Sequence, residues 1–144
     1  MNYRIVNGID HNRNTWNAGD GVNGYGNRNT IAIEICYSKS GGERFIKAEQ
    51  LAAKYLAYLM KKYGWGLDRI DDRRIGTHQD RSGKYCPHRT LDMGINRFYD
   101  MIRKEYYAIT GTNSNTATIY RVQVGAFSKQ ENADKLAKEA LGIN

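Results

Sequence analysis

Residues 31–37, IAIEICY, alternate between large apolar side chains and smaller or charged ones, and this run constrains the fold more than any other part of the chain. A period of two predicts a β-strand with one buried face. The large side chains belong to Ile31, Ile33, Ile35 and Tyr37, and the opposite face carries Ala32, Glu34 and Cys36. Glu34 then lies either on the floor of a cleft or on an exposed strand. The pattern alone leaves both alternatives open.

Two amphipathic helices are predicted after this strand. The first covers residues 47–63 and ends at Gly64, a residue that commonly terminates helices. The second covers residues 90–107, where apolar side chains recur at helical spacing. A further short strand is expected at 74–77, which would place His78 at its end. Together these elements predict an α/β domain in which helices pack on a small central sheet.

The chain of 144 residues is expected to contain one domain with a full core and the beginning of a second. We assign residues 1–107 to the first domain and residues 108–117 to a linker of small polar side chains. Residues 118–144 contain one predicted strand and one predicted helix. A single strand and helix cannot bury a core, so this second domain is expected to be incomplete.

The composition is that of an ordinary globular protein with an excess of positive charge. The net charge of +7 favours polyanions, but the 22 Lys and Arg residues are scattered and form no nucleic-acid motif. No segment is long enough to span a membrane, and the N-terminus lacks the apolar core of a secretory signal. We therefore expect no nucleic-acid and no membrane partner. Cys36 and Cys86 are compatible with one disulfide or with two separate thiols.

Residues 76–89, GTHQDRSGKYCPHR, place groups that bind metals close together in the sequence. Zinc binds histidine nitrogen and cysteine thiolate, so His78 and Cys86 can share one ion if the loop between them doubles back. Gly83 and Pro87 are suited to such a turn. The alternative is a polar loop that binds no metal.

Two further groups would complete a hydrolytic site around such an ion. Lys84 would stabilise an oxyanion that forms on a substrate carbonyl. Glu34 could take a proton from the attacking water and pass it to a leaving amine.

Three motifs together resemble the type-2 family of N-acetylmuramoyl-L-alanine amidases, which are zinc-dependent peptidoglycan hydrolases of phages and bacteria. These motifs are WNAGDG at 16–21, IEICYSKSGG at 33–42 and THQDRSGKYCPHR at 77–89. The resemblance implies the fold of peptidoglycan recognition proteins, a mixed central sheet flanked by helices with zinc in a cleft over the sheet. It also implies cleavage of the amide between the lactyl group of muramic acid and the L-alanine of the stem peptide.

The resemblance implies a role for each candidate residue. His78 and Cys86 match zinc ligands of the family, Glu34 matches the acid–base glutamate, and Lys84 matches the lysine near the metal. Asn17 departs from the pattern because histidine is frequent at this place in the W-x-A-G-D loop. Its effect on substrate contact is open.

The family's first zinc histidine belongs to an N-terminal strand that precedes the W-x-A-G-D loop, and this chain contains no such histidine. His11 lies just before the loop, and we interpret it as a solvated turn histidine. With two of three protein ligands, zinc affinity should fall severely. The expectation is a fragment of a hydrolase with weak or absent activity of its own.

The tail YRVQVGAFSKQENADKLAKE resembles the opening of the SPOR repeat, a peptidoglycan-binding module. The resemblances imply Zn²⁺ as the cofactor, peptidoglycan as the partner, and a monomer that acts outside the cell at the wall. The alternative is a non-catalytic peptidoglycan-binding protein.

Overall fold

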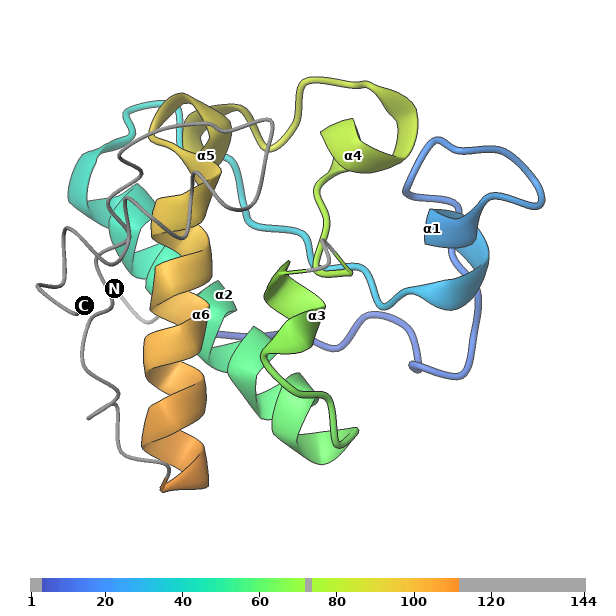
Figure 1. The fold of residues 1–144 in the computed structure, drawn as a ribbon. Coiled ribbons are helices and arrows are strands. Elements are labelled where there is room, and N and C mark those ends of the chain that lie inside the picture. The colour runs from blue at the N-terminus through green and yellow to red at the C-terminus, as the bar shows by residue number, and fades with distance from the viewer. Residues whose placement is uncertain (1–3, 72–73, 112–144) are drawn as a thin grey trace, which may run out of the picture. The chain divides into compact units, whose positions relative to one another are not determined.

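The computed structural model describes residues 4–71 and 74–111. Contacts within the chain define one compact unit at 1–114 and a second at 115–144, and the second lies outside the described residues. The elements of the described part are all helices (Figure 1). They are α1 (Tyr25–Asn29), α2 (Gly42–Lys62), α3 (Asp68–Asp71), α4 (His78–Ser82), α5 (His88–Asp92) and α6 (Ile95–Thr110).

Helix α2 covers the helix predicted at 47–63 except for its last residue, and it begins five residues earlier. It follows Gly41, whose φ of 64° favours glycine, and it ends where the Tyr63 N–H donates to the Leu59 carbonyl. Its buried face contains the small residues Ala53 and Ala57 beside larger apolar ones. Small side chains allow a second helix to approach closely, and this position is taken by α6.

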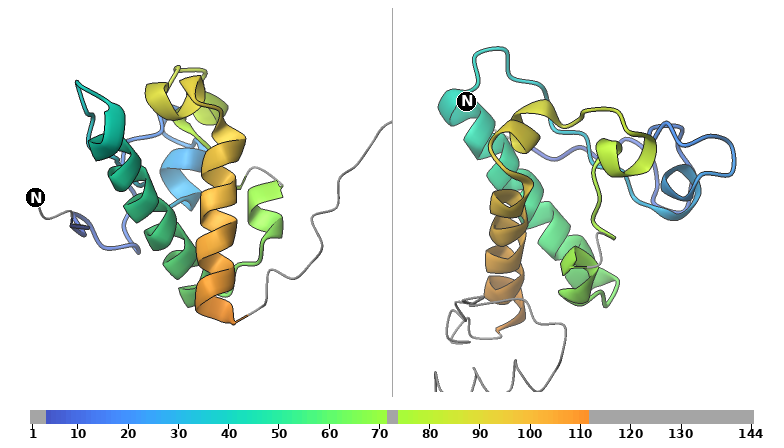
Figure 2. Two further views of the ribbon diagram at one scale, coloured as in Figure 1. Left: turned by 90° about the vertical axis from the view of Figure 1, so that its left-hand side faces the viewer. Right: turned by 45° about the horizontal axis from the view of Figure 1, so that its top comes forward.

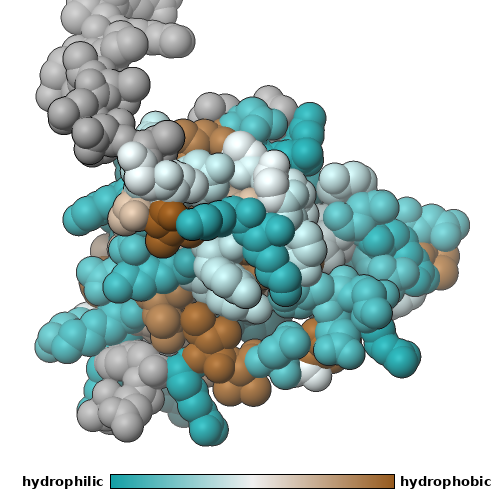
Figure 3. Space-filling model, turned by 90° about the horizontal axis from the view of Figure 1, so that it is seen from below, coloured by the Kyte–Doolittle hydropathy of each residue, from teal (hydrophilic) through white to brown (hydrophobic). Residues whose placement is uncertain are grey.

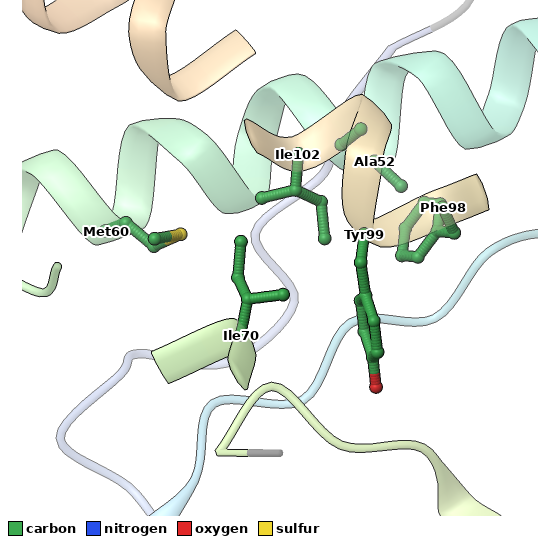
Figure 4. Close-up of a cluster of buried hydrophobic side chains, with 7 residues drawn as sticks. Ala52, Met60, Ile70, Phe98, Tyr99 and Ile102 are labelled. Atoms are coloured by element: carbon green, nitrogen blue, oxygen red, sulfur yellow. The ribbon is translucent and has the colours of Figure 1, made fainter. Parts of the chain in front are cut away.

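Helix α6 packs along α2, as the views in Figure 2 show. The helix predicted at 90–107 is divided into α5 and α6 because Gly94 adopts a φ of 91° between them. Helix α6 continues to Thr110, three residues into the predicted linker. Ile102 and Phe98 of α6 meet Ile70 of α3 and the apolar face of α2 (Figure 4). This cluster is the core of the described part.

A buried ion pair fastens α5 and α6 to α2. The carboxylate of Glu49 on α2 is inaccessible to solvent and accepts hydrogen bonds at 2.9 and 2.7 Å from Nη2 of Arg97 on α6. Thr90 on α5 donates its hydroxyl to the same carboxylate at 2.8 Å. A buried carboxylate with charged and neutral donors holds these three helices in one arrangement.

The prediction of an α/β fold with a mixed central sheet is wrong for the part of the chain that the structure describes, where no strand is present. Burial at 31–36 does alternate as expected, with partly buried isoleucines and exposed residues between them. Tyr37, which was predicted on the buried face, is 71% exposed. Ile33 and Ile35 contact the core. A strand also needs a neighbour to pair with its N–H and C=O groups, and neither residues 4–6 nor residues 74–77 supply one. The predicted strand after residue 118 lies outside the described residues.

On the face seen in Figure 3, apolar side chains gather in patches between hydrophilic ones. Several large apolar side chains near the N-terminus are exposed, among them Val6 at 70% and Ile9 at 53%. None of the helices in the described ranges combines the length and the apolar character required to cross a membrane.

Candidate functional site

The loop that carries His78 and Cys86 begins with the short helix α4. Thr77 caps this helix, because its Oγ1 accepts the Asp80 N–H at 3.3 Å and Asp80 accepts the Thr77 N–H at 2.7 Å. His78 is therefore the first residue of a helix and does not end a strand as predicted. The helix stops at Gly83, which has a φ of 78°.

The chain then doubles back, as the zinc hypothesis requires. The N–H of Gln79 donates to the carbonyl of Cys86 at 3.2 Å, so the two ends of the loop lie side by side. Cys86 is a partly buried free thiol, and Cys36 is an exposed free thiol. Thus the structure brings the backbone of Cys86 next to the residue that follows His78.

The W-x-A-G-D loop packs against the imidazole of His78. A β-carbon at Gly19 would lie 3.0 Å from Nε2 of His78 and 3.1 Å from Oγ of Ser82. Gly19 also has a φ of 72°, a conformation that other residues rarely adopt. The glycine at this position therefore allows the loop to approach the imidazole more closely than a side chain would permit.

Two polar side chains fix this loop. Asp20 accepts the N–H of Gly26 at 2.6 Å and the N–H of Asn27 at 3.2 Å, which satisfies donors in the first turn of α1. Asn27 is buried and accepts the N–H of Ala18 at 2.8 Å, while its amide donates to the carbonyl of Gly21 at 3.0 Å. Both residues therefore position the segment that flanks His78.

Glu34 and Lys84 are exposed, and among the described residues neither forms a hydrogen bond or an ion pair. Within the described ranges, no three His, Cys, Asp or Glu side chains are grouped closely enough to hold a metal ion. His78 and Cys86 match zinc in donor chemistry. Catalytic zinc usually has three protein ligands, and the described residues do not supply a third.

Arg89 connects the Cys86 loop to the segment that carries Glu34. Its Nε donates to the carbonyl of Ser38 at 3.0 Å, and its Nη2 donates to the carbonyl of Lys39 at 2.9 Å. Its guanidinium carbon lies 5.7 Å from the ring centroid of Tyr37. A β-carbon at Gly41 would lie 2.7 Å from Nη1, so this glycine leaves room for the guanidinium. We call this set of contacts the Arg89 bridge.

Tyr85 and His88 lie on either side of Cys86 and Pro87 and are both exposed. The hydroxyl of Tyr85 donates to Asp92 at 2.5 Å, and this hydrogen bond to a carboxylate raises the pKa of Tyr85 above its ordinary value. The edge of one ring faces the other, with 5.8 Å between the centroids of Tyr85 and His88. These contacts order the exposed side chains on either side of Cys86 and Pro87.

A cavity of about 480 Å³ lies elsewhere, between the N-terminal segment and α2. None of the four predicted site residues lines it. His11 does line it. The interpretation of this residue as a solvated turn histidine did not include the two tyrosine hydroxyls that its ring nitrogens contact. Its Nδ1 lies 2.8 Å from the Tyr63 hydroxyl and its Nε2 lies 3.3 Å from the Tyr55 hydroxyl.

Comparisons with known proteins agree with the motifs. The family model for N-acetylmuramoyl-L-alanine amidase matches residues 2–89, and the model for the SPOR domain matches residues 94–142. The second match begins earlier than the predicted 118 and includes α6, which packs on α2 in the first unit. Its residues beyond 111 lie outside the described part.

The N-acetylmuramoyl-L-alanine amidase CwlA of Bacillus subtilis is 55% identical over 91 residues, which cover 63% of this chain and 32% of that protein. A protein of the same name from a Bacillus species is 41% identical over 140 residues, which cover 94% of this chain and 54% of that protein. The chain thus spans about half or less of these relatives. The solved PlyG catalytic domain is similar with a TM-score of 0.58 and 40% identity, covering 76% of this chain and 61% of that one.

Proposed function

Because the chain belongs to the N-acetylmuramoyl-L-alanine amidase family, we propose that it hydrolyses the amide between the lactyl group of muramic acid and the L-alanine of the peptidoglycan stem peptide. The closed loop at 79–86 carries the proposal, because it brings together the two segments that bear His78 and Cys86. The likeness to CwlA over 91 residues supports it as well.

In this proposal His78 and Cys86 hold a zinc ion, since imidazole and thiolate are both zinc ligands. A zinc ion in such a site supplies Lewis-acid activation of the scissile carbonyl and of water. Gly19 lets the adjacent loop lie close to the imidazole of His78 without a clash, and Asp20 and Asn27 hold that loop in place. Because the described residues provide two donors rather than three, binding is expected to be weak and activity should increase with added zinc.

In this proposal Glu34 transfers the proton, and Lys84 stabilises the negative charge that develops on the substrate. The carboxylate of Glu34 takes a proton from water while the water oxygen forms a bond to the lactyl carbonyl carbon. The ammonium of Lys84 stabilises the oxyanion on that carbon. The carbon–nitrogen bond then breaks, and Glu34 returns the proton to the amine of L-alanine. The products are a free lactyl carboxylate and a stem peptide with a free amino terminus.

Product analysis tests which bond is cleaved. Purified peptidoglycan is incubated with the chain and zinc chloride, and the soluble products are identified by mass spectrometry. We expect stem peptides that begin with a free L-alanine, with no increase in reducing sugar ends. New reducing sugar ends without stem peptides that begin with L-alanine would indicate a glycosidase and would contradict the proposal.

A non-catalytic peptidoglycan-binding protein is the second candidate, and the absence of a third metal donor among the described residues favours it. The chain would then co-sediment with peptidoglycan and release no amino groups with or without zinc. The match to the SPOR domain supports peptidoglycan as the partner in either case, and with it a site of action at the cell wall. A monomer is sufficient for both functions.

A further inference from the structure

The cavity between the N-terminal segment and α2 is separate from the residues proposed for hydrolysis. It lies between residues 5–12 and the part of α2 that carries Tyr55 and Tyr58, and Figure 2 shows that the N-terminal segment runs beside this helix. Its volume of about 480 Å³ falls within the roughly 300–1,000 Å³ that is typical of ligand sites. We call it the tyrosine cavity.

The aromatic wall of the tyrosine cavity is ordered by its own contacts. Tyr55 and Tyr58 stack with ring centroids 5.9 Å apart, and Tyr63 stacks on Trp65 at 5.1 Å. His11 contacts the hydroxyls of Tyr55 and Tyr63, which fixes the N-terminal segment against the helix. Tyr58 nevertheless remains 51% exposed. Rings that are already held in place lose little entropy when a ligand binds.

The opposite wall offers polar groups that have no partner in the described protein. The side chains of Asn7, Asp10 and Asn12 line the cavity and form no hydrogen bond or ion pair with any described residue. An amide both donates and accepts hydrogen bonds, and a carboxylate accepts them. A ligand that enters the cavity thus meets aromatic faces on one side and hydrogen-bonding groups on the other.

This combination favours an uncharged saccharide. A sugar ring has apolar C–H faces that can lie on tyrosine, and its hydroxyl and N-acetyl groups can bond to amides and a carboxylate. A nucleic acid would need several cations for its phosphates. Lys62 lines the cavity, but its ammonium lies over the ring of Tyr63 at 5.4 Å, and Asp10 adds an opposing negative charge.

We propose that the tyrosine cavity binds the glycan strand of peptidoglycan as a secondary site, apart from the hydrolytic residues. The choice of peptidoglycan as the source of the saccharide rests on the proposed function. The expectation that the cavity binds an N-acetylated sugar rests on the residues that line it and not on the proposed function. Such a site would retain the chain on the polymer while the hydrolytic loop engages a stem peptide.

The proposal is tested with a soluble tetramer of N-acetylglucosamine, which contains no stem peptide. Trp65 stacks on Tyr63, so its fluorescence reports on the cavity, and replacing Trp16 with phenylalanine removes the other tryptophan. We expect a saturable change in fluorescence. Tyr58→Ala should weaken binding about three- to tenfold, the effect of losing one aromatic contact, and Asn12→Ala should also weaken it.

Tyr25→Ala is the matched control, because Tyr25 is 53% exposed and lies outside the cavity. Circular dichroism verifies that each variant is folded, and Asn12→Ala removes only an exposed side chain without a protein partner. The absence of a fluorescence change would overturn the proposal. So would equal weakening by Tyr25→Ala, or tighter binding of a single-stranded oligonucleotide. Because this assay involves no hydrolysis, its failure is distinguishable from a failure of the amidase proposal.

Discussion

At the scale of single residues, some residues of the candidate site can be predicted from the sequence and others cannot. His78 and Cys86 could be selected from residue type and spacing, since few side chains bind zinc. Asn27 could not, because its bonds go to backbone groups of Ala18 and Gly21. Such bonds depend on the folded path of the chain and leave no pattern in residue type. Thr77 and Asp80 cap a helix that begins at His78, whereas residues 74–77 were predicted as a strand.

Gly19→Ala tests whether the loop controls His78. The new β-carbon would crowd Nε2 at 3.0 Å, and the φ of 72° would be strained. Gly21→Ala is the matched control, because Gly21 has a φ of 87° and no atom within 4 Å of the new carbon. Both variants should lose about 1–2 kcal/mol of stability from the strained backbone. Only Gly19→Ala should shift the imidazole signals of His78 in an NMR spectrum. Equal shifts in both variants would refute direct control by Gly19.

At the scale of elements, the two long helices α2 and α6 were predictable, whereas the short helix α4 was missed and the predicted sheet is absent from the described residues. The apolar periodicity of α2 and α6 reflects one helix packed on another, and both helices are present. The alternation at 31–37 predicts only which side chains face the core, and Ile33 and Ile35 do so. It does not supply the neighbour that a strand requires. The break between α5 and α6 depends on the positive φ of Gly94. Glycine can adopt this conformation but need not, so the break could not be predicted from the sequence.

Arg89→Lys tests whether the Arg89 bridge positions the Cys86 loop. Lysine cannot reproduce two hydrogen bonds in a planar fork over the ring of Tyr37, so the loop should open more often. In a Cys36→Ser background, the remaining thiol should react faster with a disulfide reagent. Arg103→Lys on α6 is the control, since Arg103 pairs with the exposed Asp100. An unchanged reaction rate in Arg89→Lys would show that the bridge does not hold this loop.

Glu49→Gln tests the junction of α2, α5 and α6. The substitution leaves the guanidinium of Arg97, whose side chain is 31% exposed, without its counter-charge. We expect a loss of about 2–4 kcal/mol in the free energy of unfolding, near the range for breaking a buried pair and reduced by solvent at Arg97. Glu43→Gln removes an exposed pair with Lys47 on the same helix and should change stability little. Urea unfolding of both variants gives the comparison, and equal losses would contradict a special role for Glu49.

At the scale of the whole molecule, the motifs identified the family better than the secondary structure identified the fold. The three motifs lie within residues 2–89, the range that the amidase family model matches. Motifs preserve the chemistry of a site, whereas a sheet depends on pairing between distant segments. The net charge of +7 excluded no partner by itself. The boundaries predicted at 107 and 118 remain a prediction, because residues beyond 111 lie outside the described part.

The most direct test of the account is the rate at which amino groups are released from purified peptidoglycan with zinc present. His78→Ala and Cys86→Ser should each reduce this rate at least about tenfold, since each removes a proposed metal ligand. The matched controls are His88→Ala and Cys36→Ser, and they should retain activity. A zinc chelator should stop the reaction in the wild type. Equal rates for His78→Ala, Cys86→Ser and the wild type would contradict the central claim that these two residues form the hydrolytic centre.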